Sequence, residues 1–174
     1  MSPQVNSNAE AAVSDHTDEL VAVITDRPLV AILGTRAANG DPHLTAVWYL
    51  SVNGQLLFAT QKDSKKATHI RANPVAELCI NAGPAGPCVT AHGIATIIGP
   101  MEPEFLLRLA ERYLGLEGAQ RYMATRDPDA VSVIVSIEPQ RWRVWGSSND
   151  LETQGPMTAA SDDTGGDAMT NGRK

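Results

Sequence analysis

The chain has 174 residues, of which 43% are hydrophobic, and it carries a formal net charge of -6 with a pI near 5.1. This length and composition predict one domain with a substantial core. The negative charge opposes binding to nucleic acid and to anionic membranes, so we expect neither as a partner. The first residues lack the pattern of a signal peptide, and no window holds the roughly 18 apolar residues that span a bilayer, so we expect a cytoplasmic protein.

Both ends of the sequence have the composition of disordered segments. Residues 1–17 are mostly small and polar, and residues 148–174 are rich in Gly, Ser, Thr and Asp with almost no large apolar side chain. Such segments bury too little surface to offset the entropy of ordering them. We therefore expect a disordered N-terminus at 1–17, one folded domain at 18–147 and a disordered acidic tail at 148–174.

The first half of the expected domain combines a helix with hairpins. Residues 18–25 precede Pro28 and predict a short opening helix. Asn39-Gly40 and Asn53-Gly54 are dipeptides that hairpin turns favour. They separate three apolar segments rich in β-branched residues. These segments are expected to form a three-strand antiparallel meander: 29–35, 43–52 and 55–60.

The second half adds further strands and the clearest helix. The stretch ATHIRANP, residues 67–74, predicts a short helix that stops before Pro74. Gly93 interrupts a long strand where a barrel could bulge or bend. Residues 102–115 predict a helix with one apolar face, and Gly115 at its C-terminal end suits a helix cap. The other expected elements are strands at 75–81, 88–99, 131–137 and 141–146 and a helical piece at 117–125. This pattern predicts a mainly β protein, a small antiparallel barrel of about six strands with flanking helices.

The two cysteines, Cys79 and Cys88, show neither a CxxC motif nor the spacing of metal ligands. We expect two free thiols and no metal site.

Three of the four lysines lie within five residues, at Lys62, Lys65 and Lys66. Ser64 is a good N-cap residue, so Lys65 and Lys66 are predicted to open a helix. A helix start offers free N–H groups and a positive dipole end, and ammonium groups add charge-assisted hydrogen bonds. The cluster therefore predicts a site for a small anionic ligand. The alternative is a solvated basic turn.

The order of these pieces resembles that of the pyridoxamine 5'-phosphate oxidase-like split barrels. Within them, the chain looks most like the actinobacterial branch that uses the deazaflavin coenzyme F420. The resemblance covers about residues 18–146 and rests on LGTRAANGDPHLTAVWY, LLFATQKDSKKATHIRANPVAELCI, FLLRLAERYLG and VSVIVSIEPQRWRVWG. It implies a six-stranded antiparallel split β-barrel of the FMN-binding type. It also implies a homodimer with the cofactor at the subunit interface.

The resemblance implies the cofactor-binding residues as well. Ser64, Lys65 and Lys66 match the turn that holds the cofactor phosphate in this family, and Lys62 lies just before it. The ring of the cofactor is expected to lie against the strand segment Thr45, Ala46, Val47 and Trp48 and near the strand end Ala59 and Thr60. Asn81 and Trp145 are further candidates for contact with it. The alternative for Trp48 is an ordinary core residue.

The function that this resemblance implies is hydride transfer from reduced F420 to an electron-poor small molecule, such as an enone, a quinone or a tetrapyrrole. No catalytic side chain is identified, and the polar strand residues His43, Tyr49 and His92 are interpreted as structural. The closing RWRVWG segment lacks the Arg-x-His pattern of the true oxidases, which argues against vitamin B6 oxidation. Segments 81–87 and 117–130 are expected to shape the substrate pocket.

Two alternatives remain open at this point. One is an FMN-dependent oxidase or reductase of the same fold. The other is a flavin- or haem-binding barrel without enzymatic activity, for which His69 is the candidate haem ligand.

Overall fold

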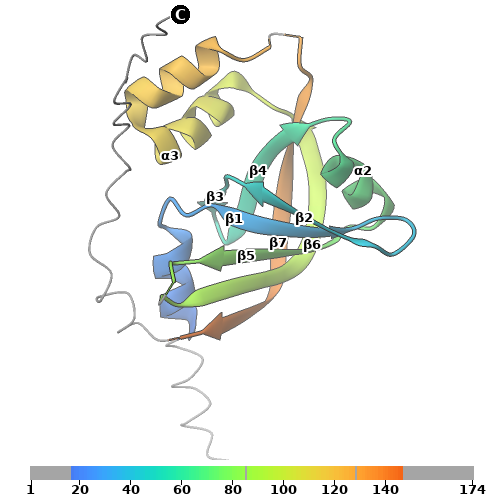
Figure 1. Ribbon diagram of the computed structural model, residues 1–174, viewed down its shortest axis with the longest axis vertical. Coiled ribbons are helices and arrows are strands. Elements are labelled where there is room, and N and C mark those ends of the chain that lie inside the picture. Colours follow the sequence, from blue (N-terminus) through green and yellow to red (C-terminus); the bar gives the residue numbers. More distant parts are fainter. Residues whose placement is uncertain (1–16, 85, 128, 147–174) are drawn as a thin grey trace, which may run out of the picture.

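A computed structural model describes residues 17–84, 86–127 and 129–146 (Figure 1). The expected disordered ends lie outside these residues, except for Thr17. The described part of the chain forms a helix at 17–25, seven strands and two further helices, α2 (Lys65–Ala72) and α3 (Pro103–Ala124). The predicted class, mainly β with flanking helices, is confirmed.

All strand pairs in the sheet are antiparallel, and the strand order is β2-β1-β5-β6-β7-β4-β3. The strands are β1 (Ala31–Arg36), β2 (Pro42–Val47), β3 (Leu50–Val52), β4 (Gln55–Gln61), β5 (Val75–Asn81), β6 (Cys88–Pro100) and β7 (Ser132–Trp145).

Three of the expected strand segments are divided differently in the structure. The segment 43–52 breaks at Trp48 and Tyr49 and forms both β2 and β3, whereas the segments 131–137 and 141–146 join in the single strand β7. The sheet of the described residues has seven strands, where a barrel of about six was expected. The break coincides with a long-range contact from α3, in which the N–H of Tyr49 donates to the hydroxyl of Tyr113 at 3.1 Å. That N–H is therefore satisfied outside the sheet.

The predicted three-strand meander is wrong. The Asn-Gly turns do join β1 to β2 and β3 to β4 in antiparallel pairs, and Gly40 and Gly54 take positive φ values of 92° and 79°. However, β2 and β3 lie at opposite ends of the strand order, and β4 pairs with β7. The strand break sends the chain from one end of the sheet to the other, which is what splits the barrel.

The interior of the barrel is filled by alternate residues of the strands. The largest completely buried side chains include Tyr49, Leu33, Leu56, Phe58, Leu78, Ile80, Val89, Val135 and Ile137. The predicted opening helix is confirmed at 17–25, and its residues Leu20, Val21 and Ile24 close the same core. Burying each such side chain contributes roughly 1.5–3 kcal/mol, so these positions fix the register of the strands.

Helices α2 and α3 form where the sequence predicts them. Ser64 caps α2 by accepting a hydrogen bond from the N–H of Ala67 at 3.3 Å. Gly115, with a φ of 68°, kinks α3 and divides it into the two expected pieces. Leu106 and Leu109 of α3 pack with Leu50 of β3 in a second apolar cluster. In Figure 1, α3 lies as a separate layer over one end of the strands. No helix in the described ranges is long and apolar enough to cross a membrane.

The long strands β6 and β7 bend at two irregularities, one between His92 and Gly93 and one between Ile97 and Gly99. At the first, a Cβ atom on Gly93 would lie 2.1 Å from the carbonyl oxygen of Glu138, which is backbone and cannot rotate away. At the second, a Cβ atom on Gly99 would meet nothing within 4 Å. The predicted bend at Gly93 is confirmed, and its cause is the close approach of β7.

We expect Gly93→Ala to lower the free energy of unfolding by about 3 kcal/mol or more, because the added methyl group forces β6 and β7 apart. Gly99→Ala is the matched control in the same strand and should change it by less than about 1 kcal/mol. Urea denaturation of both variants measures this difference. Equal losses would contradict the close-approach explanation.

Candidate functional site

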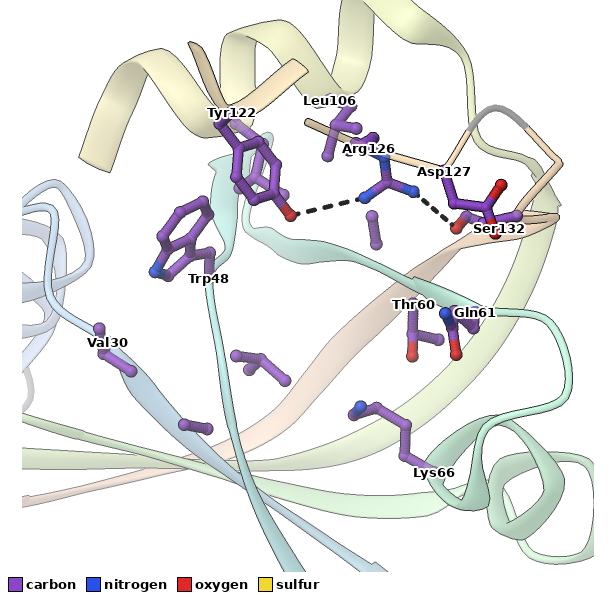
Figure 2. Close-up of a pocket in the computed structure, with 15 residues that line it drawn as sticks. Val30, Trp48, Thr60, Gln61, Lys66, Leu106, Tyr122, Arg126, Asp127 and Ser132 are labelled. Atoms are coloured by element: carbon purple, nitrogen blue, oxygen red, sulfur yellow. Dashed lines mark hydrogen bonds between the residues drawn. The ribbon is translucent and has the colours of Figure 1, made fainter. Parts of the chain in front are cut away.

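A cavity of about 430 Å³ lies between the ends of β2 and β4, the start of β7 and helix α3 (Figure 2). Its size is within the range of pockets for small ligands and cofactors. Its lining residues are Val30, Ala46, Val47, Trp48, Ala59, Thr60, Gln61, Lys66, Leu106, Leu109, Tyr122, Arg126, Asp127, Ala130 and Ser132.

One end of the cavity is formed where β4 leads into α2. The hydroxyl groups of Thr60 and Ser64 lie 2.9 Å apart within hydrogen-bonding distance, and Ser64 also caps the helix. Lys66, in the first turn of α2, is partly buried and lines the cavity. Burial lowers the pKa of Lys66. Among the described residues no carboxylate lies within ion-pair distance of it. Lys66 is therefore an unpaired cation facing the cavity.

The aromatic wall of the cavity is built around Trp48. Its ring stacks on Tyr113 with centroids 5.0 Å apart and an interplanar angle of 8°, and it lies 5.4 Å from the ring of Tyr122. Trp48 is packed against the α3 cluster and also lines the cavity. Trp48 is therefore a packed side chain with one surface on the cavity, and its contact with a cofactor ring stays a prediction.

A second cation, Arg126, lies on the opposite side of the cavity from Lys66, as Figure 2 shows. Its Nη2 donates to the Ser132 hydroxyl at 3.2 Å, its Nη1 donates to the Tyr122 hydroxyl at 3.5 Å, and its guanidinium lies 6.0 Å from the centre of the Tyr122 ring. These partners are neutral, and in the described part of the chain no carboxylate forms an ion pair with Arg126. The guanidinium is therefore oriented and remains free to bind an anion.

The structure brings together only part of the predicted site. Six of the predicted residues line the cavity: Ala46, Val47, Trp48, Ala59, Thr60 and Lys66. Ser64 does not line it but is hydrogen-bonded to Thr60, which does. Thr45 precedes Ala46 on β2 and lies outside the lining.

Other predicted residues lie farther away. Lys62 and Lys65 are exposed and do not line the cavity. Lys62 lies in the turn before α2, and Lys65, the first residue of α2, has a different helical phase from Lys66. Asn81 and Trp145 flank Cys88 across three strands at the far end of the sheet, outside the cavity lining. Their contact with a cofactor stays a prediction, which for Trp145 involves the cofactor site of a second subunit.

Most residues of the cavity roof were not predicted individually from the sequence. Tyr122, Arg126 and Asp127 come from the end of α3 and the turn after it, and Ser132 begins β7. These residues fall in or next to the segment 117–130, which was expected to shape a substrate pocket. That expectation was the one sign in the sequence that this segment contributes to a cavity. Of the segment 81–87, also expected there, none of the described residues (81–84, 86 and 87) lines the cavity.

The polar strand residues do not face the cavity either. Tyr49 is completely buried, its hydroxyl donates to the carbonyl of Thr25 at 3.4 Å, and burial raises its pKa. His92 lies 3.6 Å from Glu77 on the sheet. These contacts agree with the structural roles predicted for them.

His69, the candidate haem ligand, lies outside the cavity lining. Its Nδ1 is 3.2 Å from the Thr35 hydroxyl, and its ring packs edge-on against His43. Within the described ranges, no cluster of three or more His, Cys, Asp or Glu residues is arranged to hold a metal ion.

The family model for pyridoxamine 5'-phosphate oxidase matches residues 16–146 of the chain. The chain belongs to this family. The match covers the whole described barrel, and it confirms the pyridoxamine 5'-phosphate oxidase-like split-barrel fold. No protein of curated function matches the chain.

Solved structures with the same fold carry different functional names. An F420 reductase is 23% identical with a TM-score of 0.57, and the match covers 70% of this chain and 94% of that one. A conserved hypothetical protein of Mycobacterium tuberculosis is 26% identical with a TM-score of 0.59, over 83% and 92% of the two chains. A haem-binding protein of Mycobacterium smegmatis is 22% identical with a TM-score of 0.56, over 76% and 55%. These likenesses support the split-barrel fold of the family.

Proposed function

We propose that the protein is a coenzyme F420-dependent oxidoreductase of the pyridoxamine 5'-phosphate oxidase family, which acts on an electron-poor small molecule. The observation that carries the proposal is the unpaired Lys66 at the start of α2, beside a cavity with an aromatic wall. When bound, the deazaflavin supplies the hydride chemistry, and the protein supplies binding and orientation.

The phosphate of the cofactor suits the Lys66 end of the cavity. The ammonium group, the start of α2 and the hydroxyl groups of Thr60 and Ser64 offer a positive charge and several donors within one turn of the chain. Burial lowers the pKa of Lys66 and so disfavours its charged form. A bound anion would offset this effect, because an opposite charge stabilises a partly buried ammonium group.

The ring system suits the wall formed by Val47, Trp48 and Ala59. Trp48 is held flat against Tyr113, so the wall is rigid and mostly apolar. A planar ring gains contact area there without ordering new side chains. No described side chain in the cavity is an evident proton donor to a substrate carbon, so solvent supplies the proton in this proposal.

Arg126 favours F420 over FMN as the cofactor. FMN carries one phosphate, which Lys66 and its neighbours can hold. F420 carries carboxylates in addition to its phosphate, and a second unpaired cation on the same cavity gives them a partner. The alternative is an FMN-dependent enzyme of the same fold, and titration of the protein with both cofactors distinguishes the two.

We also propose a homodimer. Three large apolar side chains in and just before β1 and β2 are exposed: Val30 at 49%, Ile32 at 41% and Leu44 at 70%. Val30 also lines the cavity. A twofold contact is the commonest way to cover such a surface, and here it would bring a partner next to the cavity. Light scattering should find a dimer, and a monomer that binds the cofactor tightly would contradict this part of the proposal.

Lys66→Met should weaken F420 binding at least about tenfold, because it removes the cation at the phosphate. Lys65→Met is the matched control on the adjacent exposed residue and should change the affinity less than about threefold. Fluorescence titration measures both. A deazaflavin without phosphate and acidic tail should bind the Lys66 variant and the unchanged protein equally. If both lysine variants behave alike, the phosphate does not lie at this end of the cavity.

Arg126→Met should weaken F420 binding by about fivefold or more and FMN binding by less than about twofold, since only F420 offers carboxylates to this side. Arg121→Met, on the exposed surface of α3, serves as the control. A comparable loss of both cofactors would contradict the assignment of Arg126 to the acidic tail. Tight binding of FMN alone to the unchanged protein would overturn the proposed F420 dependence.

A further inference from the structure

The two cysteines of the chain lie side by side on neighbouring strands. Cys79 is on β5, Cys88 is on β6, and their Sγ atoms are 3.4 Å apart. In the register of the strands Cys79 is opposite Thr90 and Cys88 is opposite Asn81, so the two residues are diagonal neighbours on one face of the sheet. Both are free thiols and partly buried, and neither lines the cavity. No part of the proposed cofactor chemistry uses them.

The backbone around the pair is fixed. Strands β5 and β6 pair without a register shift from Val75 opposite Ile94 to Asn81 opposite Cys88. The connection between them is closed by a hydrogen bond from the N–H of Ala82 to the carbonyl of Pro87 at 3.0 Å. The sheet therefore holds the sulfur atoms together, and side-chain rotation has to bring them from 3.4 Å to a bond of about 2.05 Å.

We propose that Cys79 and Cys88 are a redox-active thiol pair, which hydrogen peroxide converts to an intramolecular disulfide and which small thiols reduce again. The first step joins the attacking sulfur to one peroxide oxygen, giving a sulfenic acid and water. In the second step the other sulfur attacks the sulfenic sulfur, and the hydroxyl group leaves as water with the thiol proton. Two thiols lose two electrons in total, and one peroxide is reduced to two molecules of water.

The contact between the two sulfur atoms fixes the order of events. Whichever sulfur reacts with peroxide first, the other is the resolving thiol that gives up its proton when the disulfide closes. Burial and the neighbouring Cys79 raise the pKa of Cys88 to about 11. Because the two sulfur atoms are already in contact, the second step should outrun further oxidation of the sulfenic acid.

The structure also supplies a reporter for this reaction. Trp145 of β7 is directly opposite Cys88 and is 53% exposed. Directly opposed side chains in a sheet lie close together, and a disulfide quenches the fluorescence of an adjacent indole. Trp48 is at the cavity and Trp142 packs against the core, so the quenching should come from Trp145.

The test treats the full chain with hydrogen peroxide and follows its intact mass, free thiols and tryptophan fluorescence. We expect a mass loss of about 2 Da, no free thiol, and quenching that dithiothreitol reverses. The disulfide should form at least about tenfold faster than in the same chain unfolded in urea, because the sheet positions the sulfur atoms.

Three variants keep this test decisive. Cys79→Ser and Cys88→Ser should each gain oxygen instead of losing about 2 Da, and neither should show reversible quenching. Trp145→Phe should still form the disulfide but lose most of the fluorescence change. The proposal is overturned if the unchanged chain keeps both thiols, if both oxidise separately to sulfinic acids, or if folding gives no gain in rate.

Discussion

The hydroxyl group of Tyr113 holds the chain where β2 ends and β3 begins. It accepts from the N–H of Tyr49 at 3.1 Å and donates to the carbonyl of Leu29 at 3.1 Å. The neighbouring Arg112 donates to two carbonyls at the end of the opening helix, those of Thr25 at 2.8 Å and Arg27 at 2.7 Å. Two successive residues of α3 thus join the opening helix, the entry to β1 and the strand break, and the division of the barrel depends on this junction.

The same junction creates the candidate site. Once the chain leaves β2 at Trp48, this side chain stacks on Tyr113, and α3 becomes the roof of a cavity between the two halves of the barrel. The chain is acidic overall, with a net charge of -6, yet Lys66 and Arg126 face the cavity without a described acidic partner. Charges act more strongly at a partly dry site than on an open surface. The cavity lining holds two cations, Lys66 and Arg126, and one carboxylate, Asp127, so its balance is positive although the whole chain is acidic.

Features that depend on nearby residues could be predicted from the sequence. The Asn-Gly turns, the cap at Ser64 and the bend at Gly93 each follow from a few neighbouring positions. The strand break could not be predicted, because the hydroxyl that satisfies Tyr49 comes from a residue 64 positions later.

The candidate site shows the same division. The lysine cluster pointed to a turn that borders the cavity, but composition could not tell that Lys66 alone of the three lines it. Arg126 gave no signal because it is a single charge in a turn, and its role depends on Tyr122 and Ser132.

The most direct test of this account is a crystal structure of the protein with F420. The account predicts that the cofactor lies in the cavity between Lys66 and Arg126. Its phosphate should be within about 3 Å of the Lys66 Nζ, and its ring should lie against the wall that contains Trp48. A cofactor bound along the exposed Lys62 and Lys65, with the cavity left empty, would contradict it.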